Sequence, residues 1–173
     1  MKSLSLVLAV ALAGSLAIAA APAEAQIKVG YTLSATGPAA ALGGPQKNAV
    51  ALLPSEIAGQ KVEYIVLDDA TDGTKAVANA RKMITEDKID VLMGSSVAPT
   101  SFPLIDIAAE NKVPLIVITA SAATVVPVDD KKRWAFKVVQ HDSLMAQAVV
   151  EHMKKAGVKT VGFLGYSDAY GES

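Results

Sequence analysis

The sequence predicts an α/β fold built on a doubly wound parallel sheet. After residue 25, short runs of β-type residues alternate with longer amphipathic stretches, which is the order of strands and helices in such folds. The run at residues 114–118 is apolar without a break, as expected of a strand buried on both faces of a parallel sheet. No internal repeat, low-complexity tract or long linker interrupts the alternation.

Each strand and helix can be placed from residue type and periodicity. The strands are expected at residues 27–33, 62–67, 91–93, 114–118, 134–138 and 160–164. The helices are expected from about residue 46 to Pro54, and over about 74–86, 100–111 and 143–156. Pro54 ends the first helix because its ring cannot sit inside one. Asp72 stands where the second helix needs an N-cap, and Gly157 ends the fourth because glycine readily adopts the left-handed conformation.

The first 25 residues predict a secretory signal peptide. Lys2 gives a positive start, residues 4–21 are almost all apolar and carry no charge, and Ala23 and Ala25 form the small-residue pattern of a cleavage site. An uncleaved membrane anchor is the alternative, because the apolar run approaches the length of a spanning helix. Cleavage is the favoured interpretation, so we expect a periplasmic protein whose folded part begins at Gln26.

Composition excludes several classes of partner and chemistry. Without residues 1–25 the chain keeps 15 basic and 16 acidic residues, since the segment removes one of the 16 Lys and Arg and one of the 17 Asp and Glu. Such a balance gives no electrostatic reason to bind nucleic acid or an anionic membrane. The chain has no cysteine, which excludes disulfides, thiolate nucleophiles and Cys-ligated zinc.

Two loops at the predicted carboxyl edge of the sheet are candidates for a ligand site, because open parallel sheets bind ligands at that edge. Ser95 and Ser96 lead into a helix whose first amides lack intrahelical partners and suit an anion such as a carboxylate. Simple helix capping is the alternative. Residues 119–124 form a second loop rich in hydroxyls and alanine. Together the loops favour a small polar ligand held by neutral hydrogen bonds.

Signatures of enzymes and cofactors are largely missing. Asp68, Asp69 and Asp72 permit a divalent metal or phosphoacceptor site, although a helix start and a solvated turn are the favoured interpretation. Neither G-x-G-x-x-G nor the P-loop motif occurs. Residues 165–169 approach a nucleophile elbow, but Ala169 replaces its last glycine. We therefore expect no cofactor, no metal and no enzymatic activity.

Several short segments, in order, resemble one known family. I-K-V-G at 27–30 precedes S-A-T-G-P at 34–38, and D-D at 68–69 precedes K-A-V-A-N-A-R-K-M-I at 75–84. V-P-L-I at 113–116 precedes S-A-A-T at 121–124, and D-A-Y-G follows at 168–171. This order, behind a signal peptide, is similar to the type I periplasmic solute-binding proteins of ABC importers, in their leucine/isoleucine/valine-binding branch.

The resemblance implies a fold and a function. Residues 26–173 would form the N-terminal lobe of a two-lobed protein, with the second lobe missing and the chain truncated at the crossover to it. The ligand would be a small carboxylate-bearing solute, such as a branched-chain or other amino acid, presented to the membrane permease of an ABC importer. The short first helix with Pro54 departs from the family, in which this helix is usually longer.

The resemblance also implies ligand-binding residues. The family's Ser-rich turn falls on Ser95 and Ser96, and its A-A-T segment, where a backbone amide and a hydroxyl hold the α-carboxylate and α-ammonium, falls on Ala122 and Thr124. Its cleft tyrosine falls on Tyr170, and the first-loop residue that touches the ligand side chain falls near Leu42.

Two alternatives to a transport protein remain at this point. The same fold serves as the ligand-binding module of receptors and regulators. An exported α/β hydrolase is the third possibility, motivated by Ser167 within the imperfect elbow.

Overall fold

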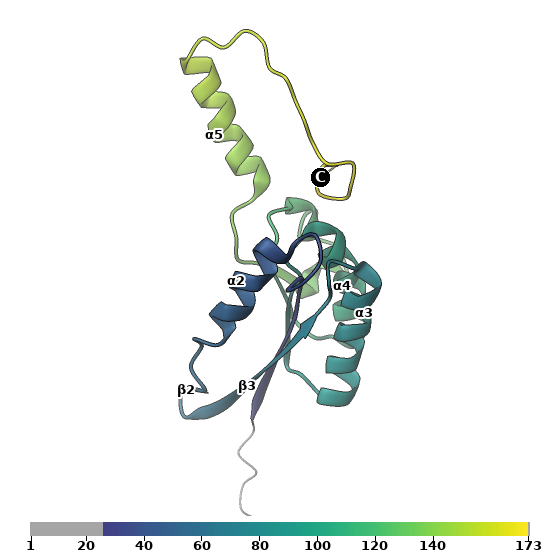
Figure 1. Ribbon diagram of the computed structural model, residues 1–173. Coiled ribbons are helices and arrows are strands. Elements are labelled where there is room, and N and C mark those ends of the chain that lie inside the picture. Colours follow the sequence, from purple (N-terminus) through teal and green to yellow (C-terminus); the bar gives the residue numbers. More distant parts are fainter. Residues whose placement is uncertain (1–25, 173) are drawn as a thin grey trace, which may run out of the picture.

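The structure, a computed structural model, describes residues 26–172, so the predicted signal peptide lies outside the described residues. A six-stranded sheet in the order β2-β3-β1-β4-β5-β6 forms the centre of the fold (Figure 1). The strands are β1 (Ile27–Leu33), β2 (Glu56–Ile57), β3 (Gln60–Asp68), β4 (Val91–Gly94), β5 (Leu115–Val117) and β6 (Ala135–Lys137). Five of the six predicted strands are thereby confirmed.

All neighbouring strands run parallel except the short edge pair of β2 and β3. The register brings the carboxyl ends of three strands together, because Thr32 on β1 lies opposite both Leu67 on β3 and Gly94 on β4. The loops that leave these strands therefore emerge side by side at one edge of the sheet.

The main helices are α2 (Ala40–Val50), α3 (Gly73–Lys82), α4 (Ala98–Asn111) and α5 (Asp142–Lys155). Helix α3 continues into a π-helical turn, η1 (Met83–Asp87), and two 3₁₀ turns follow later, η2 (Ala122–Thr124) and η3 (Lys132–Trp134). The predicted cap of α3 is present: the Asp72 carboxylate accepts the N–H of Lys75 at 2.8 Å.

Helix α2 begins earlier than the sequence predicts. It starts at Ala40 instead of near Gln46, and Pro45 lies inside it. Pro45 lacks an N–H, so the helix does without one backbone hydrogen bond there. The expected end before Pro54 is confirmed, since the helix stops at Val50.

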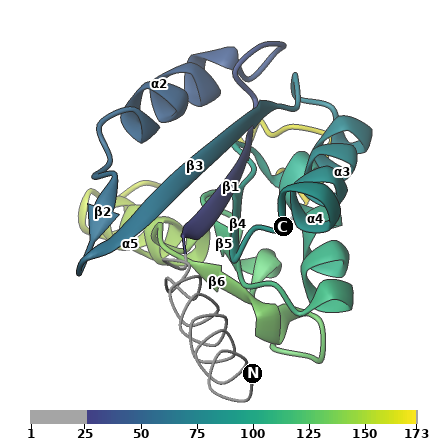
Figure 2. The same ribbon diagram turned by 90° about the horizontal axis from the view of Figure 1, so that it is seen from below.

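Helices cover both faces of the sheet, which is the doubly wound arrangement that the sequence predicts. Figure 2 shows α2 over one face and α3 with α4 over the other. Fully buried apolar side chains fill the α3/α4 side, among them Met83, Leu92, Leu104 and Leu115. A smaller cluster of Tyr31, Leu33 and Val50 lies beneath α2. Burying each such large apolar side chain stabilises the fold by about 1.5–3 kcal/mol.

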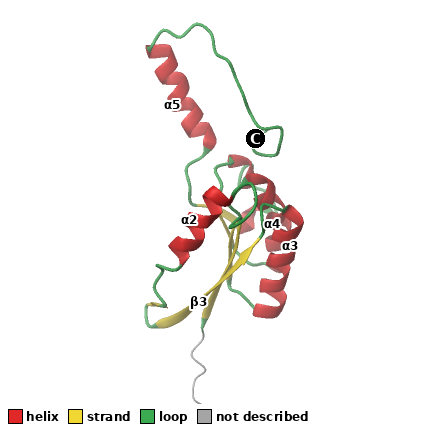
Figure 3. Ribbon diagram, viewed as in Figure 1, coloured by secondary structure: helices red, strands yellow, loops and turns green. Residues whose placement is uncertain are grey.

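The sixth predicted strand is wrong. Residues 160–164 form no strand, and every one of them is exposed. In Figure 3 the whole stretch after α5 is drawn as a loop, and α5 itself extends away from the sheet. Helix α5 has no buried residue. The apolar, β-branched run supplies strand propensity, but a strand also needs a neighbour to complete its backbone hydrogen bonds, and this segment pairs with none in the described chain.

Within residues 26–172, no helix combines the length and the apolar composition required to cross a bilayer.

Candidate binding cleft

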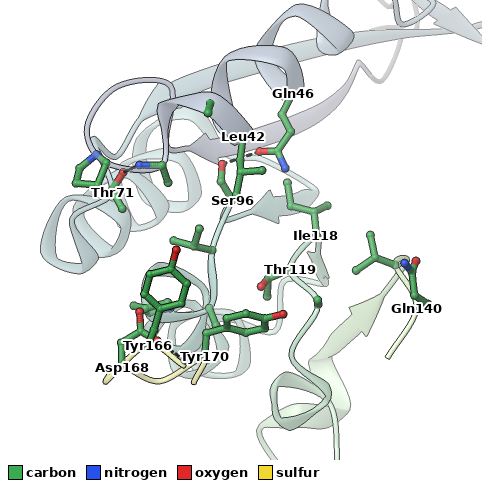
Figure 4. A pocket seen from close by; sticks show the side chains of 18 residues that line it. Leu42, Gln46, Thr71, Ser96, Ile118, Thr119, Gln140, Tyr166, Asp168 and Tyr170 are labelled. Atoms are coloured by element: carbon green, nitrogen blue, oxygen red, sulfur yellow. Dashed lines mark hydrogen bonds between the residues drawn. The ribbon is translucent and has the colours of Figure 1, made fainter. Parts of the chain in front are cut away.

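A cleft of about 580 Å³ opens at the carboxyl edge of the sheet (Figure 4). Its walls come from α2 and the loop before it, the start of α4, the loop after β5, the segment after β6, and the chain after residue 165. The side chains that shape it most are Leu42, Gln46, Ser96, Ile118, Tyr166 and Tyr170. The sheet edge expected from the parallel topology is therefore where the hollow lies.

Helix α2 comes close to this edge because Gly43 has no side chain. A Cβ atom on Gly43 would lie 2.1 Å from the backbone oxygen of Ser34, at the exit of β1. The helix can therefore rest directly on the β1 loop. Leu42 and Gln46 are four residues apart, so they share the helix face that lines the cleft.

Ser96 links the floor of the cleft to α2. Its Oγ accepts the N–H of Ser34 at 2.9 Å and donates its proton to Oε1 of Gln46 at 2.6 Å. The side chain is almost fully buried, with 5% exposed. Ser96 therefore belongs to the cleft wall, but its hydroxyl is already engaged within the protein.

Ser95 lies one layer deeper, in a network around the carboxylate of Asp69. This carboxylate is fully buried and accepts hydrogen bonds from four groups: the hydroxyls of Thr32 (3.2 Å), Ser34 (2.7 Å) and Ser95 (2.5 Å) and the N–H of Thr71 (2.9 Å). We call these five residues the Asp69 network. It joins the exits of β1, β3 and β4, and so fixes three loops of the cleft relative to one another.

The first turn of α4 lies at the cleft, and because its second residue, Pro99, has no N–H, only some of its first positions carry a backbone amide donor. Its N-cap residue, Val97, provides no side-chain cap, and both Val97 and Ala98 line the cleft. The first amides of a helix have no intrahelical acceptor, and the helix dipole makes that end positive. The positive end of the helix dipole therefore lies at the cleft, and the anion site expected in this loop stays a prediction.

The second predicted loop contributes different residues from those expected. Thr119 and Ala120 line the cleft, whereas Ala122 and Thr124 do not. Thr124 is fully buried and its hydroxyl donates to the carbonyl of Ser121 at 2.7 Å. The N–H of Ala122 donates to the carboxylate of Asp142 at 3.2 Å, which ties this loop to the start of α5.

Of the six predicted site residues, the structure brings Leu42, Ser96 and Tyr170 together at the cleft and leaves the other three behind it. Tyr166 and Tyr170 extend side by side into the hollow in Figure 4. Their loop is held by Asp168, whose Oδ1 accepts the N–H groups of Tyr170 (2.9 Å) and Gly171 (3.1 Å).

Sequence reasoning missed Gln46, Ile118, Tyr166 and Gln140. Gln46 had a usable signal, since it stands one helical turn after Leu42. Gln140 had none, because its position depends on where the chain goes after β6. Among the described residues, no lysine, arginine or histidine lines the cleft, and Asp168 is the one charged residue that does.

Lys137 braces the segment that leaves the sheet toward α5. Its Nζ donates to the carbonyls of Val139 and Gln140, each at 2.8 Å. Burial lowers the pKa of Lys137 below the usual value for lysine, while the nearby Asp142 carboxylate acts in the opposite direction. Val139 and Gln140 line the cleft, so Lys137 holds part of its wall.

The acidic turn before α3 is divided between surface and interior. Asp68 is exposed, and the hydroxyl of Thr36 and backbone N–H groups lower the pKa of its carboxyl. Asp69 is buried, so the expectation of a solvated turn is wrong for this residue. Among residues 26–172, no group of three or more His, Cys, Asp or Glu side chains is placed to hold a metal ion.

The nucleophile-elbow hypothesis is also wrong. An elbow places its serine between a strand and a helix, whereas Ser167 lies in an irregular loop with neither element beside it.

Comparison with known proteins extends these observations. The sequence profile of the family described as "Periplasmic binding protein" matches residues 26–173. The Leu/Ile/Val-binding protein BraC3 of Rhizobium johnstonii is 30% identical over 160 residues, which is 87% of this chain and 42% of that protein. The chain therefore spans less than half the length of this relative.

Two solved structures from Rhodopseudomonas palustris are similar over the same region. An extracellular ligand-binding receptor of strain HaA2 is 55% identical with a TM-score of 0.83, over 86% of this chain and 41% of that one. A solute binding protein of an ABC transporter from strain BisB5, solved with 3,4-dihydroxybenzoic acid, is 26% identical with a TM-score of 0.77, over 85% of this chain and 41% of that one.

Proposed function

Because the chain belongs to the periplasmic binding protein family, we propose that it serves as the solute-binding component of an ABC importer and holds a small carboxylate-bearing solute in the cleft. Periplasmic binding proteins are solute-binding proteins and not enzymes, and they act outside the cytoplasm. The observation that carries the proposal is the start of α4, which has no side-chain cap and lies at a cleft that no cationic side chain of residues 26–172 lines.

The part of the cleft at the start of α4, which we call its α4 corner, favours an anion of low charge. Free amides and the positive end of a helix dipole bind a carboxylate by neutral hydrogen bonds. They release the carboxylate more readily than a cationic side chain in a buried ion pair would. Release from such a pair leaves an uncompensated buried charge on the protein, which is costly. Reversible capture is what delivery to a transporter requires.

The rest of the cleft suits an apolar body on the solute. Leu42 and Ile118 supply aliphatic contacts, and Tyr166 and Tyr170 supply rings against which a planar group can pack. BraC3 is named for leucine, isoleucine and valine, and the BisB5 protein carries 3,4-dihydroxybenzoic acid. Both kinds of compound join a carboxylate to an apolar body, so both are candidate solutes for this chain.

We further propose that the solute is enclosed between two lobes. The described residues form one wall, and the relative and the solved structures are more than twice as long as the matched region. After β6 the chain leaves the sheet, and residues 138–141 connect β6 to α5. This connection, held by Lys137, is the proposed hinge, and closure over the cleft would exclude water from the carboxylate. The membrane permease of the importer is the proposed partner.

Titration calorimetry tests the proposal directly. The protein expressed from its native gene is titrated with 3,4-dihydroxybenzoate, with leucine, and with 3,4-dihydroxybenzyl alcohol as an uncharged match for the first. We expect at least one carboxylate to bind and the alcohol to bind at least about 10-fold more weakly, since hydrogen bonds to a charged group contribute about 1.5–3 kcal/mol. Equal binding of the acid and the alcohol would contradict the carboxylate assignment.

A further inference from the structure

The side-chain amide of Gln46 has a fixed orientation in the structure. Ser96 Oγ already accepts the N–H of Ser34, so its single proton is free to be donated elsewhere. It goes to Oε1 of Gln46 at 2.6 Å. A hydroxyl proton needs an acceptor, and the amide oxygen of Gln46 provides it while the amide nitrogen does not. The hydrogen-bond pattern therefore places Oε1 toward Ser96 and Nε2 on the opposite side.

That opposite side is the cleft. Figure 4 shows the Gln46 oxygen joined to Ser96 and its nitrogen turned toward Ile118, in the hollow. Gln46 is half-buried and lines the cleft, one helical turn after Leu42. Within residues 26–172, no carbonyl or side chain accepts a hydrogen bond from Nε2. Two N–H donors are thus held in the cleft without a protein acceptor.

The surroundings define what these donors can bind. Ser96 is the residue before Val97, the N-cap of α4, so its bond to Gln46 ties the Gln46 side chain to the segment that leads into α4. A group with several acceptor lone pairs, such as a carboxylate, can accept from both N–H groups of Nε2.

We infer that Gln46 is a ligand-binding residue that donates from Nε2 to a carboxylate oxygen of the solute and selects for an oxyanion at this point of the cleft. The inference rests on the proposed function. It assigns Ser96 a second role, that of orienting the Gln46 amide, in addition to its place in the cleft wall.

Two variants separate the donor role of Gln46 from its structural bond to Ser96. Gln46→Glu keeps an oxygen to accept the Ser96 proton but places a negative acceptor where the donor stood. Gln46→Met keeps a similar length and removes both functions. Lys47→Met is the matched control, because Lys47 is exposed on the same helix and does not line the cleft. Each variant is made in the native gene, and binding of 3,4-dihydroxybenzoate and leucine is measured by calorimetry at pH 7.5.

For whichever carboxylate the wild type binds, Gln46→Met should weaken the affinity by about 10- to 100-fold, the value of one hydrogen bond to a charged group. Gln46→Glu should weaken it at least as much, because a carboxylate then faces a carboxylate. Lys47→Met should leave it within about twofold.

Each remaining outcome overturns a defined statement. Unchanged affinity in Gln46→Met, with the wild type binding, overturns the assignment of Gln46 and leaves the proposed function standing. Loss in Gln46→Met with full affinity in Gln46→Glu overturns the oxyanion at this point of the cleft, since an acceptor is then tolerated. Failure of the wild type to bind either carboxylate overturns the proposed function and this inference with it.

Discussion

Replacing Asp69 removes the acceptor that the Asp69 network shares. In Asp69→Asn one oxygen becomes an NH₂ group, and at least one of the four donors then meets another donor. Leaving a buried donor unsatisfied costs about 1–3 kcal/mol, so we expect the free energy of unfolding to fall by about 2–3 kcal/mol. Urea denaturation of the purified protein measures this change. Asp72→Asn is the matched control and should change stability by less than about 0.5 kcal/mol, because asparagine caps a helix as well as aspartate does.

A similar loss in both variants would mean that the buried network contributes no more than an ordinary helix cap. The same two residues show what sequence reasoning can reach at this scale. The cap at Asp72 could be predicted from local pattern alone. The burial of Asp69 could not, because three nearby aspartates look alike in sequence, and only the register of β1, β3 and β4 brings hydroxyls around one of them.

At the scale of elements, the seating of α2 can be tested with two adjacent glycines. Gly43→Ala would place a Cβ atom 2.1 Å from the Ser34 oxygen and 2.2 Å from its carbonyl carbon. The helix must then lift from the sheet, and we expect a loss of stability of about 1–3 kcal/mol together with weaker solute binding. Gly44→Ala meets no atom within 4 Å, so it should stabilise the helix by about 0.5–1 kcal/mol. Thermal unfolding and calorimetry on both variants measure the contrast.

If both alanine variants behaved alike, the close approach of α2 to Ser34 would be refuted.

The existence of the elements was largely predictable, because apolar runs and helical periodicity record which faces are buried. The residues at which the elements begin and end were less predictable. Helix α2 begins before Pro45, and periodicity could not reveal this start because Gly43 and Val50 are the only buried residues of the helix. Residues 160–164 carry strand propensity without a strand to pair with.

Across the whole molecule, α5 stands apart from the sheet, and its apolar side chains are exposed, including Leu144 (61%) and Val149 (51%). A helix of 14 residues without tertiary packing is marginal in water. For a protein consisting of residues 26–173, hydrogen exchange of α5 amides should therefore be at least about 100-fold faster than in β1 or α4. Mass spectrometry of exchanged peptides measures the difference. Equal protection at every protein concentration would contradict this detachment, whereas protection that rises with concentration would show that copies of the chain cover the helix.

The cleft illustrates why a site is harder to foresee than a fold. Leu42, Ser96 and Tyr170 come from three distant segments of the chain, and the sequence placed them together through the resemblance and the rule that ligands bind at the carboxyl edge. Ser95, Ala122 and Thr124 satisfy the same rule, but partners within the protein take their hydrogen bonds. Ser95 is only one residue from Ser96, which lines the cleft, and only the packed structure separates the two.

The central position of β1 also governs the order in which the fold can assemble. This strand pairs with β3 on one side and with β4 on the other, so the first strand in the sequence cannot complete its hydrogen bonds until residues 91–94 are available. Pairing between such distant segments carries the entropy of closing long loops before it gains any stability. A chain emerging from its N-terminus therefore stays without a finished sheet at least until residue 94 has appeared, and it must be kept from aggregating over that interval.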